Sequence, residues 1–183
     1  LFDDLVNKTK KNIIYGDKSP SYINHLPLLY KIFPDANFLH IIRDPRDQAL
    51  SIKKAWNKSV YLSASNWYKS IISVKNFVSK NKINYLEFKY EDLIINPRPT
   101  LELIFDFINL EFNLEMLNFN DSIENVGEAK GLKSIKNNNF NKFRNHLTKN
   151  QIKKIELLTF PIIKSLNYTL DNKINYHKDL NKI

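Results

Sequence analysis

The sequence predicts an α/β fold in which a parallel sheet is flanked by helices. Three short β-rich runs alternate with segments whose apolar residues recur at helical spacing, the pattern of strand–helix–strand units. The central run, residues 37–42, is continuously apolar, as in strands covered on both faces. With 183 residues and 43% hydrophobic side chains the chain has enough material for one core. We therefore expect a single domain over 1–183 with a polar tail at about 169–183.

The first elements are a helix, a strand and a crossover helix. Residues 1–10 alternate apolar and charged side chains at helical spacing, and residues 12–16 form a short β-rich run that Gly16 ends. Pro20 suits the start of a helix, and apolar residues then recur at helical intervals until Pro34. These segments predict an amphipathic helix that leads from one strand to the next.

The central strand runs directly into a helix. Residues 37–42 predict a strand buried on both faces, as expected at the centre of a parallel sheet. Asp44 is a candidate N-cap and Pro45 occupies a favoured first-turn position. The helix is expected to continue to Trp56. The order strand, turn, helix N-terminus places residues 43–47 where α/β proteins bind ligands.

Residues 60–110 predict two helices with a strand between them. The apolar spacing indicates helices over residues 60–79 and 97–110, with a strand at 84–90 between them that turns out at residues 91–93. A polar loop rich in lysine and asparagine occupies roughly 119–139.

The last predicted helix has a capping signature. Thr148 is an N-cap candidate with Gln151 at the capping-box position, and apolar residues at helical spacing follow. Pro161 is expected to kink or interrupt this helix, because proline has no N–H for the helical hydrogen bond.

The composition indicates which kinds of ligand and which cellular compartment suit this protein. The net charge is +9 and the pI is about 9.5, which favours polyanions: nucleotides, phosphorylated or sulfated acceptors, or nucleic acid. The lysines are scattered along the whole chain among asparagines and isoleucines. The absence of cysteine excludes disulfides and thiolate metal sites, so we expect a reducing compartment, the cytoplasm. No apolar stretch approaches the roughly 20 residues of a membrane helix.

The strongest candidate site follows the central strand. Arg43 ends the strand and Ser51 lies on the next helix, whose N-terminus offers free N–H groups to an anion. Arginine adds a planar fork of donors, so the pair predicts a phosphate site. The alternative is a structural salt bridge of Arg43 with Asp44 or Asp47 and a solvated hydroxyl at Ser51.

These residues resemble the sulfotransferase family. Its members share a segment like residues 43–47, Arg-Asp-Pro-Arg-Asp, with a serine eight positions after the arginine, and a Phe-Pro-x-Ala-x-Phe stretch like residues 33–38 before it. The resemblance implies a P-loop NTPase-like sulfotransferase fold and the donor 3′-phosphoadenosine 5′-phosphosulfate (PAPS). It also implies that Arg43 and Ser51 hold the 3′-phosphate of the donor.

Three more motifs carry the resemblance in the same order, from about Gly16 to Tyr168. The Lys-Ser-Pro segment at 18–20 implies that Lys18 acts in catalysis on the transferring sulfuryl group. The Tyr-Glu-Asp-Leu stretch at 90–93 implies that Tyr90 lies near the nucleotide. Residues 139–147 resemble a late donor-contacting segment whose lysine is Lys142, with phenylalanine at 143 where tryptophan is more usual. Without the resemblance, Lys18 reads as an exposed turn lysine and Tyr90 as a core aromatic residue.

The implied reaction moves a sulfuryl group from PAPS to a hydroxyl or amine of a small-molecule or carbohydrate acceptor, and no metal is required. In-line transfer of this kind needs positioning and charge stabilisation, as in phosphoryl transfer. The general base stays unassigned. Where cytosolic relatives have histidine this chain has Pro20. Relatives with a Lys-Thr/Ser-Pro segment use a glutamate further upstream, so the resemblance implies a base before Leu1, and neither His25 nor His40 is assigned. The acceptor and the oligomeric state are left open.

One family segment does not occur in these 183 residues. The glycine-containing Arg-Ser-Gly-Thr-like turn that grips the 5′-phosphosulfate is missing, and with it the first strand of the fold. We therefore expect the carboxy-terminal part of a sulfotransferase domain, whose activity alone is left open. Two other functions remain: a basic nucleic-acid-binding module, and a nucleotide kinase-like phosphotransferase whose Gly-rich loop and magnesium ligand are not visible.

Overall fold

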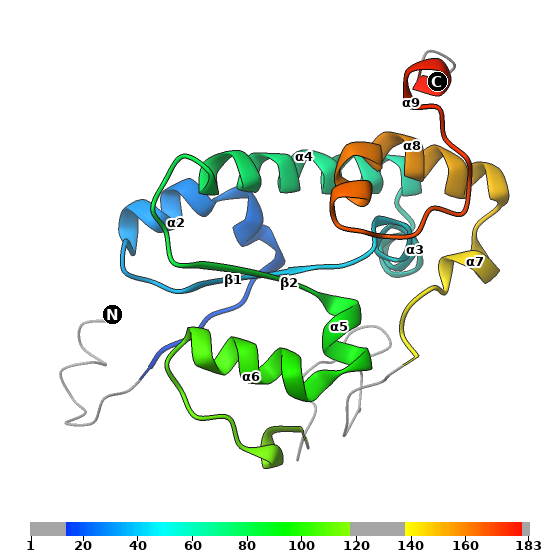
Figure 1. Cartoon of the computed structure of the whole chain (residues 1–183). Helices are drawn as coiled ribbons and strands as arrows, with labels where there is room; N and C mark the ends of the chain where they lie inside the picture. The colour runs from blue at the N-terminus through cyan, green and yellow to red at the C-terminus, as the bar shows by residue number, and fades with distance from the viewer. Residues whose placement is uncertain (1–13, 118–137, 181–183) are drawn as a thin grey trace.

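The computed structural model describes residues 14–117 and 138–180. In this part the chain alternates helices with two strands (Figure 1). In chain order the elements are η1 (Pro20–Asn24), α2 (Leu26–Ile32), β1 (Phe38–Ile42), α3 (Pro45–Trp56), α4 (Val60–Val78), β2 (Tyr85–Lys89), α5 (Tyr90–Ile95), α6 (Pro97–Phe107), η2 (Leu114–Leu117), α7 (Phe143–His146), α8 (Lys149–Ser165) and α9 (Tyr176–Leu180).

The two strands form a parallel pair. Phe38 lies opposite Tyr85 and Ile42 opposite Lys89, so both strands end at the same edge of the sheet. Helices α4 and α8 lie on one side of the strands and α6 lies on the other (Figure 1). The predicted α/β fold with a parallel sheet is therefore confirmed. The parallel register also brings the residues that follow β1 and β2 together, where the candidate site was expected.

The face of the sheet toward α4 and α8 is packed. Ile42 is 1% exposed and belongs to one buried cluster with Trp67, Ile71 and Ile162. A second cluster joins α3, α4, α7 and α8, and Phe143 and Ile155 are fully buried in it. Both clusters contain residues of α4 and α8, the two long helices that hold the sheet.

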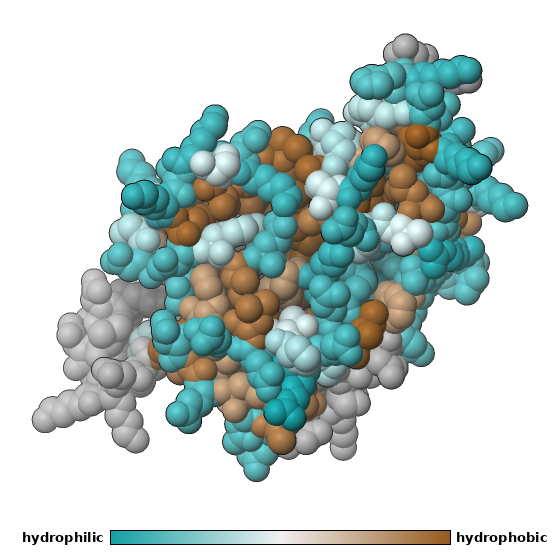
Figure 2. Space-filling model, in the orientation of Figure 1, coloured by the Kyte–Doolittle hydropathy of each residue, from teal (hydrophilic) through white to brown (hydrophobic). Residues whose placement is uncertain are grey.

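The opposite face of β1 is open, which corrects the prediction of burial on both faces. Leu39 and Ile41 are 45% and 46% exposed. The physical reason is that α6, which lies on this side, packs mainly against β2 of the two strands. Apolar surface is accordingly visible over the region of the strands and α6 (Figure 2).

The segment before β1 also differs from the prediction. Residues 14–16 are irregular and not a strand, while residues 12–13 and the predicted helix 1–10 lie outside the described residues. The crossover helix is split into η1 and α2 at His25, because Pro27 has no N–H to continue the hydrogen bonding of the preceding helix and suits the first turn of a new one.

The predicted caps of two helices are confirmed. The side chain of Asp44 accepts a hydrogen bond from the Arg46 N–H at the start of α3, which spans the predicted residues to Trp56. Thr148 and Gln151 form the capping box at the start of α8. These caps satisfy N–H groups that a helix start leaves without partners.

Three later segments depart from the prediction. The turn at 91–93 is part of the short helix α5. Helix α8 is not interrupted at Pro161, because this side chain is exposed while Ile162, Ile163 and other neighbours are buried and hold the helix in place. The polar tail packs back on α8 and contains α9. Most of the predicted loop 119–139 lies outside the described residues.

None of the described helices is both long enough and apolar enough to cross a bilayer.

Candidate functional site

The candidate site begins at Arg43, immediately after β1. Its backbone carbonyl accepts a hydrogen bond from the indole N–H of Trp67 on α4 (3.1 Å), which fixes the backbone at this turn. Its Nη2 donates to the backbone carbonyl of Asn139 (3.0 Å), and the side-chain Oδ1 of Asn139 lies 3.4 Å away. The guanidinium group therefore leaves the sheet edge and meets a segment 96 residues later in the chain.

The Tyr90 ring completes the surroundings of Arg43. Tyr90 follows β2 as Arg43 follows β1, and the guanidinium carbon lies 4.7 Å from the centre of the tyrosine ring. The phenol oxygen accepts a hydrogen bond from the Asn139 amide (2.8 Å). Arg43, Tyr90 and Asn139 thus form a closed group of contacts, in which a cation–π contact and two hydrogen bonds hold the guanidinium.

One hydrogen-bond donor of the Arg43 guanidinium is not satisfied by the described residues. Its Nε is buried and has no hydrogen-bond partner among the described residues. A buried donor without a partner costs about 1–3 kcal/mol. An anion at this place would remove that cost, because guanidinium groups bind phosphate and sulfate oxygens through adjacent N–H groups.

The two neighbouring carboxylates are occupied by other partners. Asp44 binds Arg46 through both oxygens, at 3.0 Å from Nε and 2.6 Å from Nη2. Asp47 accepts backbone N–H groups of Asn141 (2.6 Å) and Phe143 (2.9 Å). The described residues therefore contain no salt bridge from Arg43 to Asp44 or Asp47, the alternative raised by the sequence.

Arg46, and not Arg43, forms a structural salt bridge of the kind that the sequence offered as the alternative for Arg43. It is 1% exposed, and its Nη1 also donates to Glu156 of α8 (2.6 Å). Burial alone lowers the pKa of Arg46, but the hydrogen bonds and charges of Asp44 and Glu156 outweigh it and raise the pKa. The sequence did not single out Arg46, because its carboxylate partner Glu156 lies 110 residues away.

The other predicted site residues lie around this group at different depths. Lys142 is half-buried at the N-cap of α7, next to the two residues that Asp47 binds. Ser51 is exposed on α3, and no hydrogen bond joins it to Arg43 in the described part of the chain. Lys18 is exposed just before η1, where its backbone N–H binds the Asp17 carboxylate (2.8 Å). The structure thus gathers Arg43 and Tyr90, with Lys142 on the adjoining segment.

Sequence reasoning missed two members of the group, Asn139 and Asp47. Asn139 stood inside the 139–147 motif without a role, and Asp47 was considered only as a salt-bridge partner. Asparagine and aspartate have short side chains whose oxygens accept hydrogen bonds from backbone and guanidinium N–H groups. The residue types of Asp47 and Asn139 were therefore the only indication in the sequence that they could take part in the site.

A cleft of about 350 Å³ lies beside the first turn of α3. Its lining includes Asp44, Glu91 and Tyr168, and Arg43 does not line it. Glu91 accepts hydrogen bonds from the Asp44 N–H (3.0 Å) and the Tyr168 hydroxyl (2.8 Å). Burial raises the pKa of Glu91 although both hydrogen bonds lower it. Asp44, Glu91 and Tyr168, three of the residues that line this cleft, are therefore bound to one another.

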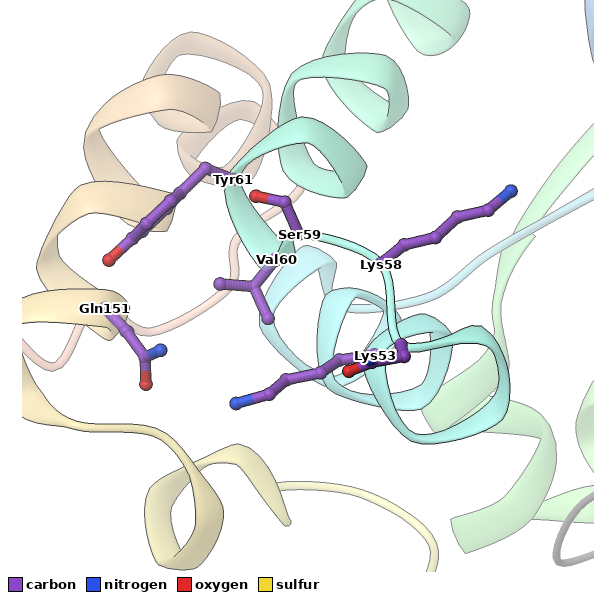
Figure 3. A pocket seen from close by; sticks show the side chains of 7 residues that line it. Lys53, Lys58, Ser59, Val60, Tyr61 and Gln151 are labelled. Atoms are coloured by element: carbon purple, nitrogen blue, oxygen red, sulfur yellow. The ribbon is translucent and has the colours of Figure 1, made fainter.

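A second cleft of about 250 Å³ lies at the far end of α3 (Figure 3). Lys53 of α3 and Gln151 of α8 border it, and Lys58, Ser59 and Tyr61 belong to its lining. Residues 48–86 contain no aspartate or glutamate, so this end of α3 is basic. It is separate from the group around Arg43, which lies at the opposite end of the helix.

His40 belongs to a hydrogen-bonded chain on the packed face of the sheet. Its Nδ1 lies 2.5 Å from the hydroxyl of Tyr85, which donates to Glu87 (2.9 Å), and Lys75 binds the other oxygen of Glu87 (2.9 Å). Because Tyr85 gives its proton to Glu87, Nδ1 of His40 carries the hydrogen of this contact. His25 is exposed.

The sequence model of the sulfotransferase family matches residues 1–113, more than half of the chain. The chain belongs to the sulfotransferase family. The match includes the Arg43 turn and Tyr90, while Asn139 and Lys142 lie beyond it.

Two solved sulfotransferase domains share the fold. One is the sulfotransferase domain from the curacin biosynthetic pathway, with a TM-score of 0.73 and 20% identity over 92% of this chain and 68% of that domain. The other is the sulfotransferase domain from the olefin synthase of Synechococcus PCC 7002, with a TM-score of 0.73 and 23% identity over 92% of this chain and 64% of that domain. The chain thus spans about two thirds of each sulfotransferase domain.

Proposed function

We propose that this sulfotransferase uses PAPS as its donor and that Arg43 binds the 3′-phosphate. The observation that carries the proposal is the buried Nε of Arg43, which has no partner among the described residues, in a guanidinium otherwise held by Asn139 and Tyr90. A donor that is both fixed and unsatisfied is prepared for an acceptor that arrives with the ligand. The position after a parallel strand and before a helix N-terminus suits a phosphate.

The remaining donor contacts are proposed for Ser51, Tyr90 and Lys142. Tyr90 already stacks against Arg43, so a nucleotide held by Arg43 lies next to this ring. Lys142 lies on the segment whose Asn139 contacts Arg43, which supports a role for its charge at the same anion. Ser51 would add a neutral hydroxyl donor from α3.

Lys18 is proposed to act on the sulfuryl group during transfer. In the reaction the acceptor oxygen or nitrogen forms a bond to sulfur, and the bond from sulfur to the bridging phosphate oxygen breaks. Negative charge then develops on that oxygen, and an ammonium group stabilises it. The acceptor loses a proton to a base that we do not assign. Adenosine 3′,5′-bisphosphate leaves as the second product.

The chain is proposed to be one domain that supplies the 3′-phosphate side of the donor site. The sequence contains no Arg-Ser-Gly-Thr-like glycine turn for the 5′-phosphosulfate. The residues named above therefore account for the nucleotide end of PAPS. The acceptor is proposed to be a hydroxyl or amine of a small molecule or carbohydrate.

The test is calorimetric binding of adenosine 3′,5′-bisphosphate to wild type and to Arg43→Ala. Because a charged, fixed hydrogen-bond partner is lost, we expect affinity to fall about 100-fold, or about 2.7 kcal/mol.

The matched control is Arg98→Ala. Arg98 is an exposed arginine of α6 that pairs with Glu102, so this variant changes the net charge equally without touching Arg43. We expect its affinity to stay within about twofold of wild type. Equal losses in the two variants would show a general charge effect and would contradict a 3′-phosphate site at Arg43.

A further inference from the structure

The contact between α3 and the 139–143 segment depends on one buried carboxylate. Asp47 lies in the first turn of α3 and is 2% exposed. Its Oδ2 accepts the N–H of Asn141 (2.6 Å), and its Oδ1 accepts the N–H of Phe143 (2.9 Å). Both oxygens are therefore used to hold one short segment of backbone.

The backbone of this segment is shaped for the carboxylate. Asn141 has a φ of 57°, in the left-handed region that asparagine tolerates better than most residues. The turn at Asn141 allows the N–H groups of residues 141 and 143 to reach the same side chain. The ring of Phe143 then lies against the guanidinium of Arg46, whose carbon is 4.2 Å from the ring centre.

The segment held in this way carries the partner of Arg43. Asn139 lies two residues before the first N–H that Asp47 binds. Its carbonyl and side chain receive Nη2 of Arg43, and its amide donates to Tyr90. The position of the Arg43 guanidinium thus depends on Asn139, and the position of Asn139 depends on Asp47.

We propose that Asp47 is a positioning residue of the donor site: by clamping the N–H groups of Asn141 and Phe143, it places Asn139 so that Arg43 is aimed at the 3′-phosphate. This inference rests on the proposed function of Arg43. Asp47 acts through the backbone of another segment and does not touch the donor itself.

If Asp47 acted only through its charge, its removal would change the affinity for the donor in the opposite direction to the loss of the clamp. Arg43 lies close enough to Asp47 for its charge to lower the pKa of that carboxyl, although burial raises it more strongly. Removing a negative charge near an anion site strengthens anion binding by Coulomb's law. Loss of the clamp weakens binding, because asparagine has only one acceptor oxygen for the two N–H groups. The sign of the change therefore distinguishes the two effects.

The experiment measures binding of adenosine 3′,5′-bisphosphate to Asp47→Asn by calorimetry, with hydrogen exchange of the Asn141 and Phe143 amides followed by NMR. We expect affinity about tenfold weaker than wild type, and exchange of at least one of the two amides faster by about tenfold or more.

Two controls isolate the clamp. Asp92→Asn removes an exposed carboxylate of α5 and is expected to keep affinity or raise it up to about twofold. Asn141→Gly keeps the N–H and adopts a φ of 57° without strain, so its affinity is expected to stay within about twofold. If Asp47→Asn fails to fold, Asn139→Ala tests the same chain of contacts without changing charge, and its affinity is expected to fall.

The outcomes separate this inference from the proposed function. If Arg43→Ala loses affinity while Asp47→Asn and Asn139→Ala keep or gain it, Asp47 is not a positioning residue and the 3′-phosphate site stands. If Arg43→Ala also keeps wild-type affinity, both proposals are wrong. Weaker binding by Asp47→Asn with unchanged exchange at residues 141 and 143 would also contradict the clamp.

Discussion

Arg43 and Arg46 are three residues apart and have opposite surroundings. Arg46 is satisfied by Asp44 and Glu156 inside the protein, with N–O distances of 2.6 Å to each. Arg43 has a backbone carbonyl, an amide oxygen and a ring as partners, none of which neutralises its charge. A guanidinium held without a carboxylate retains its attraction for anions, which is why we propose ligand binding for Arg43 and a structural role for Arg46.

The Glu87 carboxylate predicts a stability change at acidic pH. Burial alone raises the pKa of Glu87, but hydrogen bonds from His40, Lys75 and Tyr85 outweigh it and lower the pKa to about 2. The folded protein therefore binds this proton less readily than the unfolded chain. The stabilisation is present above the unfolded pKa of about 4.5 and is lost as pH falls toward 2.

The variant Glu87→Gln tests whether Glu87 loses its contribution to stability as pH falls. We expect the variant to be less stable than wild type at pH 7, with the difference in unfolding free energy shrinking as pH falls from about 4.5 toward 2. Urea unfolding over this pH range provides the measurement. Glu115→Gln, at an exposed carboxylate of η2, is the control and should track wild type at every pH. A difference for Glu87→Gln that stays constant with pH would contradict the lowered pKa.

At the scale of elements, the sequence predicted those with strong local signals. Helix α3 has both a capping aspartate and a first-turn proline, and its two predicted ends agree with the structure. Residues 14–16 are β-rich but lie outside the two-stranded sheet, and strands need a partner that local sequence does not reveal. Pro161 also shows that local sequence does not reveal tertiary packing, because burial of its neighbours keeps α8 continuous.

The capping box of α8 predicts a specific loss of stability. Thr148→Ala removes the side-chain acceptor for the Gln151 N–H (3.2 Å), so we expect about 1 kcal/mol lower unfolding free energy. Thr148→Ser keeps the hydroxyl and is expected to lose less than about 0.5 kcal/mol. Denaturant unfolding compares the three proteins. Equal losses in both variants would assign the effect to the methyl group instead of the cap.

At the scale of the molecule, Glu156 ties three parts of the chain together. This fully buried carboxylate on α8 accepts hydrogen bonds from Arg46 of α3 and from Asp171 and Asn172 of the tail. The tail is polar in sequence, yet the backbone N–H groups of Asp171 and Asn172 are bound to this buried carboxylate. The sequence could not predict this, because a buried glutamate and a surface glutamate look alike until the partners are placed.

Glu156→Gln is expected to destabilise the protein by about 3 kcal/mol, because it leaves the buried charge of Arg46 partly unpaired. The control is Glu102→Gln in the exposed pair with Arg98, with an expected loss below about 0.5 kcal/mol. Thermal and urea unfolding of both variants give the comparison. A loss in Glu156→Gln as small as in the control would show that the network adds no stability.

The candidate site was predictable where its residues are close in sequence. The predicted strand, Arg43 and the capped helix follow one another directly in the sequence, so their pattern could be recognised locally. The resemblance to sulfotransferases added Tyr90 and Lys142. Asn139 and Asp47 were not assigned because their partners lie 49 to 96 residues away. A single sequence does not reveal which distant residues come into contact. Whether Arg43, Ser51, Tyr90 and Lys142 bind the donor, and whether Lys18 acts on it, stays a prediction.

The distance between Arg43 and Asn139 along the chain also orders events during synthesis. A ribosome adds roughly 5–20 residues per second, so about 5–20 s separate the emergence of the guanidinium from that of its carbonyl partner. A nascent chain that stops before residue 139 already contains β1 and β2 but lacks the carbonyl that Arg43 binds. We therefore expect the proposed nucleotide binding at Arg43 to begin only after residue 139 has been translated.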